Sequence, residues 1–118
     1  MKVLRKGETP EQPASNPIFV GTVMGRDMVS AQEGAQVTVR LVRFLDGACN
    51  VLHVHTADQV LYITEGHGLV GTAGEDHEVT AGDIVHIPRG EPHWHGAQEG
   101  REMAHLSILP PCETRAVE

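Results

Sequence analysis

Short apolar segments separated by turn dipeptides are the feature that most constrains how this chain can fold. Turn signals such as Asp46-Gly47, Glu65-Gly66 and Arg89-Gly90 interrupt the sequence at short intervals. No window of about eleven residues keeps a helical apolar period free of Gly or Pro, so the sequence predicts no amphipathic helix. Strands are predicted near residues 18–24, 36–45, 50–55, 59–65, 67–72, 76–80, 83–87, 92–96 and 102–109. We therefore expect an all-β fold, and a closed barrel or jelly roll leaves the fewest unpaired edges.

The chain is long enough for one domain and too short for two. It has 118 residues, and 40% of them are apolar, an ordinary share for a folded domain. Prolines among polar residues predict an extended N-terminal arm over residues 1–17. The remainder is then a single barrel over residues 18–110, followed by a C-terminal tail over residues 111–118.

The charge balance and the cysteines indicate which partners and which cellular compartment to expect. The formal net charge is −7 and the basic residues are scattered, so we expect no nucleic acid as a partner. The N-terminus lacks an apolar segment and no long apolar run follows, so we expect neither a signal peptide nor a membrane span. Cys49 and Cys112 stand alone, which fits a reducing cytoplasm.

Histidines are concentrated in one half of the chain. All 8 of them lie between His53 and His105, and they include two His-x-His pairs, His53/His55 and His93/His95. On a strand, residues two apart point to the same face, so each pair presents two imidazoles side by side. Such histidines are candidate metal ligands or acid–base groups, against the alternative of ordinary core or surface residues.

The residues around these pairs resemble the two motifs of the cupin superfamily, in the family's order. The first motif reads Gly47-x5-His53-x-His55-x3-Gln59-x6-Gly66, and the second reads Gly82-x5-Pro88-x-Gly90-x2-His93. The resemblance covers about residues 36–109 and implies a cupin jelly-roll β-barrel. The chain departs from the family pattern where Gln59 replaces the usual Glu and where Ala97 replaces a frequent Asn.

A divalent transition metal is the cofactor that the resemblance implies. Its ligands would be His53, His55, Gln59 and His93. Three imidazole nitrogens and an amide oxygen suit Mn, Fe, Co, Ni, Cu or Zn, and the family favours Mn or Fe, with Zn and Ni as alternatives. Because these ligands are neutral, the ion keeps its full charge, whereas the usual Glu would cancel one unit. The sequence leaves open that Gln59 is a plain polar residue of the barrel.

Further segments narrow the resemblance to the small single-domain cupins allied to carboxymuconolactone decarboxylase, which include the cupin-type hydroxynitrile lyases. They are residues 59–68, 93–96 and 103–106. In that group nearby histidines move the proton, which implies His95 and His105 as catalytic acid–base groups. We therefore expect a metal-dependent lyase, isomerase or cyclase whose ion polarises a carbonyl or hydroxyl oxygen of a small molecule. An iron-dependent dioxygenase and a non-catalytic metal- or ligand-binding cupin are the alternatives.

Arg40 is a candidate substrate-binding residue. In the predicted strand 36–45 it shares a face with Val42 and Phe44. If that face lines the barrel, the guanidinium favours an anionic substrate, a carboxylate or an enolate. Otherwise Arg40 lies on the outer layer or at an oligomer edge. The histidines without a motif are predicted at the surface or at the rim of the barrel, and they are His67, His77 and His86.

We predict that the protein is a homodimer or a larger assembly. A small barrel with an extended arm has an unpaired strand edge and a segment that can pair with a second copy. Light scattering at micromolar concentration should give at least twice the chain mass of 12.8 kDa. A measured mass near 12.8 kDa would contradict the prediction.

Overall fold

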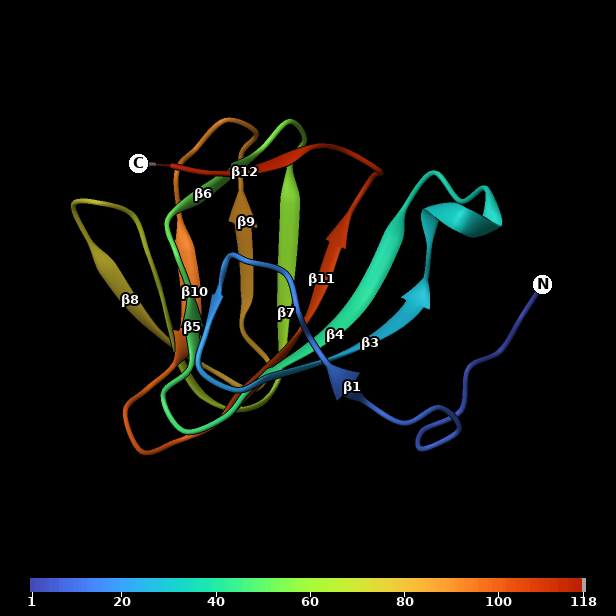
Figure 1. Cartoon of the computed structure of the whole chain (residues 1–118), viewed down its shortest axis with the longest axis horizontal. Coiled ribbons are helices and arrows are strands. Elements are labelled where there is room, and N and C mark those ends of the chain that lie inside the picture. The colour runs from blue at the N-terminus through green and yellow to red at the C-terminus, as the bar shows by residue number, and fades with distance from the viewer. Residues whose placement is uncertain (118) are drawn as a thin grey trace.

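Strands dominate the structure, a computed structural model that describes residues 1–117 (Figure 1). The strands are β1 (Gln12–Pro13), β2 (Phe19–Val20), β3 (Val23–Val29), β4 (Thr38–Phe44), β5 (Cys49–Asn50), β6 (His53–His55), β7 (Gln59–Gly71), β8 (Asp76–Thr80), β9 (Ile84–Ile87), β10 (Trp94–Ala97), β11 (Met103–Leu109) and β12 (Thr114–Ala116). The helix η1 (Ala31–Glu33) is a single 3₁₀ turn, and none of the residues described forms a helix able to cross a membrane. The predicted all-β fold is confirmed.

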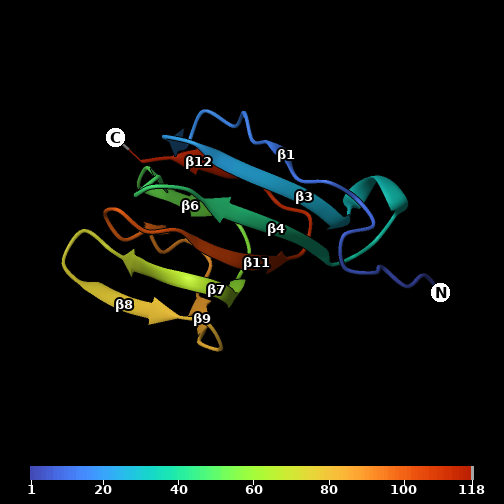
Figure 2. The same ribbon diagram turned by 90° about the horizontal axis from the view of Figure 1, so that it is seen from below.

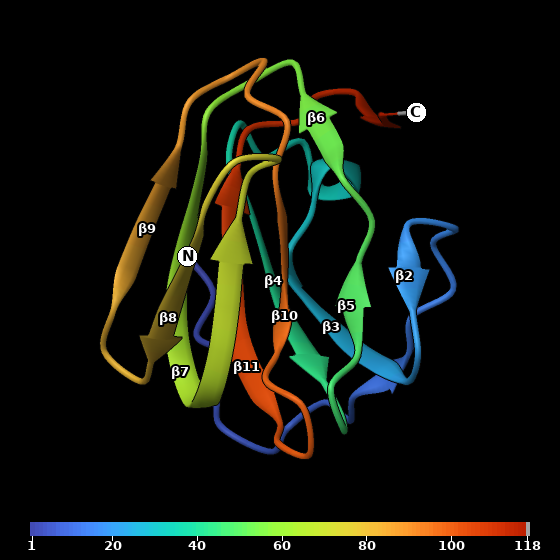
Figure 3. The same cartoon turned by 90° about the vertical axis from the view of Figure 1, so that its left-hand side faces the viewer.

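Antiparallel pairing joins most strands into one curled sheet. Its order is β1-β3-β4-β11-β7-β10-β5-β2, and β8 and β9 both pair with β7. Figure 2 shows β3, β4, β11 and β7 side by side on one wall, and Figure 3 shows β7, β10 and β5 on the adjoining wall. The first half of β7 pairs with β11 and its second half with β10, so β7 belongs to both walls. The sheet therefore curves round an interior, as in a β-barrel.

Gly66 bends β7 instead of ending it. The sequence predicts two strands with a turn at Glu65-Gly66, and this prediction is wrong, because the structure has one strand of 13 residues. Gly66 has a φ of 81°, a left-handed value that favours glycine, and a Cβ there would collide with the carbonyl of Glu102. The register against β11 shifts between Ala104 and His105, which marks a β-bulge. The bulge lets one continuous strand pass from the first wall to the second.

Both ends of the chain contribute strands. Within the predicted arm, β1 pairs with β3, and within the predicted tail, β12 pairs with β6 in a small separate sheet. Glu118 lies outside the described residues. The predicted strand 18–24 is divided into β2 and β3 at Gly21, whose φ is 88°. The C-terminal segment thus lies along the strand that carries His53 and His55. The formation of a homodimer or larger assembly stays a prediction.

The barrel interior is apolar at one end and polar at the other. Along the inward face of β4, Phe44 and Val42 are buried in the apolar core, whereas Arg40 lines a cavity. β11 makes the same change, from Met103 in the core to Ser107 at the cavity. Further core side chains include Val23, Leu61, Ile63 and Val79. Burial of each large apolar side chain contributes about 2 kcal/mol, so the apolar end stabilises the barrel and the polar end is available for a site.

Candidate metal centre

Three buried histidines come together at the polar end of the barrel. His53 and His55 lie on β6, and His93 directly precedes β10. Two backbone hydrogen bonds join the two motifs: the N–H of His53 donates to the carbonyl of His93 at 2.9 Å, and the reverse bond measures 3.0 Å. One ring nitrogen from each histidine lies within 4.8 Å of the others. The three side chains are therefore positioned to hold one metal ion.

Backbone carbonyls orient two of these rings. Nδ1 of His53 lies 2.7 Å from the carbonyl oxygen of Val51, and Nδ1 of His93 lies 2.9 Å from that of Glu91. Because a carbonyl oxygen only accepts, both Nδ1 atoms carry the hydrogen, and both Nε2 atoms are left as free lone pairs. Contacts of this kind commonly fix the orientation of metal-binding histidines.

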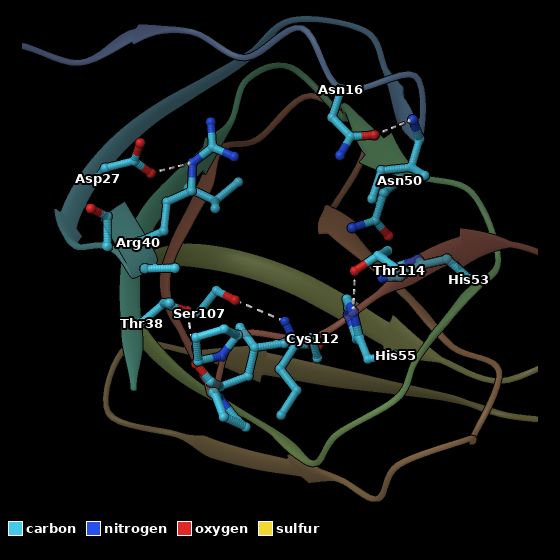
Figure 4. Close-up of a pocket in the computed structure, with 18 of the residues that line it drawn as sticks. Asn16, Asp27, Thr38, Arg40, Asn50, His53, His55, Ser107, Cys112 and Thr114 are labelled. Carbon is cyan, nitrogen blue, oxygen red and sulfur yellow. Dashed lines mark hydrogen bonds and ion pairs between the residues drawn. The ribbon is translucent and has the colours of Figure 1, made fainter. Parts of the chain in front are cut away.

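His55 shows most directly that a ligand belongs in this space. Its Nδ1 contacts the hydroxyl of Thr114 on β12 at 2.7 Å, which holds the ring in place (Figure 4). Its Nε2 is buried and has no hydrogen-bond partner within residues 1–117. A buried polar atom without a partner is costly, and a metal ion would satisfy this one.

Gln59 places its amide oxygen against the same cluster. It begins β7, it is 3% exposed, and its Nε2 donates to Oγ of Ser107 at 2.8 Å. Its Oε1 then faces Nε2 of His93 at 3.1 Å. With the hydrogen of His93 on Nδ1, two lone pairs face each other, and a cation between them would relieve this repulsion. The donor set therefore fits an ion held by three imidazoles and one amide oxygen.

Burial keeps the three clustered imidazoles neutral. It lowers the pKa of His53 and that of His55 from 6.5 to about 4, and it also lowers the pKa of His93. Neutral imidazole is the form that binds a metal ion. At neutral pH the site can therefore bind without first releasing protons.

A second pair of histidines lies beside these three. His95 on β10 and His105 on β11 are buried, and Nδ1 of His95 lies 2.9 Å from Nε2 of His105. The ring centres of His95 and His53 are 5.5 Å apart, so His95 stands between the triad and His105. Burial lowers the pKa of His105 to about 4 and that of His95 well below 6.5. Both rings are neutral at pH 7 and can accept a proton.

Asn50 is a site residue that the sequence analysis missed. Its Oδ1 accepts the backbone N–H of His95 at 2.8 Å, and its Nδ2 lies 3.3 Å from Nε2 of the same ring. In a single strand over residues 50–55, Asn50 would point away from the face that carries His53 and His55. The structure breaks that strand into β5 and β6, and both parts bury these side chains. The alternation of side chains along one predicted strand therefore could not place Asn50 in the site.

The polar end of the barrel opens into a cavity of about 430 Å³ (Figure 4). His53 and His55 lie at one side of it, and Arg40 lies at the opposite side. The inward face of β4 lines this cavity, so Arg40 points into it and not toward the outer layer.

The three histidines that belong to neither motif are exposed, and they are His67, His77 and His86.

Fold and site together define a small β-barrel protein with an inward-facing histidine cluster positioned for a metal ion. Comparison with known proteins identifies its family. A cupin domain matches residues 40–109, more than half of the chain. The protein therefore belongs to the cupin domain family, and the single-domain cupin barrel expected from the sequence is confirmed.

Three similar proteins are informative. An (R)-mandelonitrile lyase of Granulicella tundricola is 33% identical over 119 residues, which cover 100% of this chain and 91% of the lyase. A cupin-like protein of Thermotoga maritima is 28% identical, with a TM-score of 0.81 over 98% of this chain and 90% of its own. An acireductone dioxygenase of Geobacillus thermodenitrificans is 36% identical over 64 residues, 49% of this chain and 36% of the dioxygenase. The first two matches span nearly the whole chain.

Removing a ligand should remove the metal ion, whereas removing His105 should not. For His93→Ala purified with Mn²⁺ or Fe²⁺ in the medium, we expect metal affinity to fall by roughly tenfold or more, because one imidazole is lost. His105→Ala should keep the wild-type metal content, since His105 contacts His95 and is not one of the three clustered histidines. Elemental analysis measures both, with the exposed His67→Ala as control. If His105→Ala also lost its metal, His105 would be a fifth ligand.

The metal-free protein should lose stability as the pH falls. A histidine whose pKa is lowered in the folded state binds fewer protons than it does unfolded, so its contribution is complete above pH 6.5 and is lost as the pH falls toward 4. His53, His55 and His105, whose pKa falls to about 4, each contribute up to about 3 kcal/mol across that range. Urea unfolding at pH 7.5 and at about pH 4.5 should show the loss, and His105→Phe should reduce it. Equal free energies of unfolding at both pH values would contradict this account.

Proposed function

We propose that this protein is a metal-dependent lyase that cleaves the carbon–carbon bond between the hydroxyl carbon and the nitrile carbon of an α-hydroxynitrile. The observation that carries the proposal is the pair His95 and His105, whose facing nitrogens are 2.9 Å apart beside a neutral metal-binding cluster. A proton acceptor next to a position for a Lewis acid meets the needs of a reaction that begins at a hydroxyl group. The name of the relative that matches the whole chain, (R)-mandelonitrile lyase, supports the choice of substrate class.

The reaction transfers one proton and breaks one carbon–carbon bond. The hydroxyl group of R–CH(OH)–CN loses its proton, its oxygen becomes the aldehyde oxygen, and the electron pair of the broken bond leaves with cyanide. Cyanide then takes up a proton as hydrogen cyanide. A divalent ion held by the three histidines and Gln59 would supply Lewis acidity near the hydroxyl oxygen, with its charge uncancelled by any ligand.

The chain itself provides the path for the proton. His95 lies nearer to the triad and is the first acceptor, and its contact with His105 allows the proton to be relayed away and returned to cyanide. Asn50 contacts both the backbone and the ring of His95, which holds the ring in place. The ring of Phe44 lies 5.8 Å from that of His95 and 5.6 Å from that of His105, so it keeps water away from the far side of the pair.

An iron-dependent dioxygenase is the second candidate. The observation that favours it is the 36% identity to acireductone dioxygenase, although the match covers only 36% of that protein. Histidine ligands that leave positions open suit iron and dioxygen. Consumption of dioxygen by the iron-loaded protein in the presence of an enediol substrate would support the dioxygenase function. Tight retention of a small molecule without any turnover would select a non-catalytic cupin.

The lyase proposal predicts that metal-loaded protein releases cyanide and aldehyde from α-hydroxynitriles. His105→Ala should lower kcat by about a hundredfold or more, because general acid–base groups commonly contribute that much, while the metal content stays unchanged. Aldehyde absorbance gives kcat, and elemental analysis gives the metal content. His105→Gln keeps more of the buried volume and serves as a second variant, and the exposed His77→Ala should leave kcat unchanged. If fully loaded protein released no cyanide from aromatic, aliphatic or carboxylated hydroxynitriles, the proposal would be wrong.

A further inference from the structure

The two arginines of β4 point to opposite sides of the sheet and have different surroundings. Arg43, on the outer face, lies within 4 Å of three carboxylates. They belong to Glu11, Glu65 and Glu102. Arg40, on the inner face, faces one carboxylate, that of Asp27, at 3.4 Å from its Nε. Nε and Nη1 of Arg43 thus have carboxylate partners, whereas Nε of Arg40 has no hydrogen-bond partner among the described residues.

The guanidinium of Arg40 has a hydrogen-bond donor to spare. Its Nε is buried and has no hydrogen-bond partner among the described residues, because Asp27 meets it outside bonding geometry. The side chain of Asp27 is 73% exposed, and exposed ion pairs contribute little to stability. A buried donor left unpaired, in contrast, is costly. A ligand that paired with Nε would therefore gain more than the loss of Asp27 costs.

Gly25 on β3 makes room for this guanidinium. A Cβ at Gly25 would lie 2.6 Å from Nη2 of Arg40 and 3.0 Å from its Nε, so any larger residue would displace the group. The neighbouring strand thus accommodates Arg40 against the wall of the barrel. The Nε that lacks a partner is therefore buried against the wall of the barrel, although the Arg40 side chain as a whole is 38% exposed.

The charges around the cavity favour an anion. Among the described residues that line it, Arg40 is the one side chain that is always cationic, and Asp27 is the one carboxylate. With a divalent ion on neutral ligands, the cavity carries net positive charge. Such a cavity attracts an anionic molecule more strongly than an uncharged one.

Ser107 and Gln59 connect Arg40 to the metal-binding cluster along the sheet. Arg40 pairs with Ser107 on β11, and Oγ of Ser107 accepts the hydrogen bond from Gln59 on β7. Neighbouring strands are about 4.8 Å apart, so the backbones of β4 and β7 stand about 10 Å apart across β11. Figure 4 shows Arg40 across the open cavity from His55. A small molecule can therefore touch the guanidinium with one end and the histidines with the other.

We propose that Arg40 binds a carboxylate of the substrate, so that the substrate of this protein is an anionic hydroxy compound and not an uncharged one. Combined with the proposed lyase activity, on which this substrate class rests, the substrate is an α-hydroxynitrile whose carbon chain carries a carboxylate. Nε and one Nη of Arg40 donate two parallel hydrogen bonds to the carboxylate oxygens. Asp27 turns into solvent, and the hydroxyl end of the substrate reaches the histidines.

Binding of two matched ligands tests this proposal without relying on turnover. The probes are phenylacetate and its neutral amide, phenylacetamide, titrated calorimetrically into the metal-loaded protein. We expect phenylacetate to bind about tenfold more tightly or better, because hydrogen bonds between charged groups are strong. Arg40→Gln should abolish this preference, and Arg40→Lys, which keeps the charge but not the planar fork, should retain part of it. Arg26→Gln removes one charge from the outer face of β3 and should change neither affinity.

Two further measurements separate this inference from the lyase proposal. Gly25→Ala displaces the guanidinium without removing charge and should also reduce the preference for phenylacetate. The hydroxynitrile of 4-formylbenzoate should be cleaved with a kcat/KM about tenfold higher than that of mandelonitrile, and Arg40→Gln should remove the difference.

Each outcome decides between the two proposals. Equal affinity of the wild-type protein for the two probes would overturn the carboxylate site. An unchanged preference in Arg40→Gln would also overturn it and would place the carboxylate on the metal ion. If neither hydroxynitrile were cleaved while the preference still depended on Arg40, the lyase proposal would fail and the carboxylate site would stand.

Discussion

The polar end of the barrel depends on two backbone hydrogen bonds that join His53 to His93. They tie together segments that lie far apart in the sequence, and the residues that form this bridge also supply two of the three imidazoles. The main chain therefore sets the distance between the two imidazoles, and a hydrogen-bonded backbone holds such a distance more rigidly than flexible long side chains do. Pairing of β12 with β6 reinforces the arrangement, because it brings Thr114 onto Nδ1 of His55.

Burial determines the chemistry that this arrangement can perform. It keeps the triad neutral, as metal binding requires, and it keeps the pair of His95 and His105 neutral, as proton acceptance requires. The cost of burying so many polar rings is offset by fixed partners on one nitrogen of each ring of the triad and by the apolar core at the other end of the barrel. The unpartnered Nε2 of His55 and the lone pairs facing each other between His93 and Gln59 mark the place where this compensation is incomplete.

Side chains alternate between the two faces of β4, and this gives its two arginines different roles. On β4, Arg43 points outward and binds carboxylates of this chain, including Glu11 from the N-terminal segment. Arg40 points inward, where the carboxylate that faces it among residues 1–117 is that of the exposed Asp27. Arg43 thus forms ion pairs on the outer face of the sheet, whereas Arg40 keeps an unpaired hydrogen-bond donor beside the cavity. The proposed recognition of a carboxylate follows from this difference in partners.

The sequence by itself determined the features that are local. Turn dipeptides and short apolar segments predict strands, and the two motifs predict the histidines and Gln59 that gather at one end of the barrel. Tertiary structure alone decided which distant groups meet. The left-handed backbone of Gly66 and the bulge opposite Ala104 and His105 carry β7 through a predicted turn. The break between β5 and β6 brings Asn50 into phase with His53. The curvature and register of the sheets bring Thr114 into contact with His55 and leave Arg40 facing the cavity. Curvature and register are set by pairing between residues far apart in the chain, and no local sequence pattern encodes that pairing.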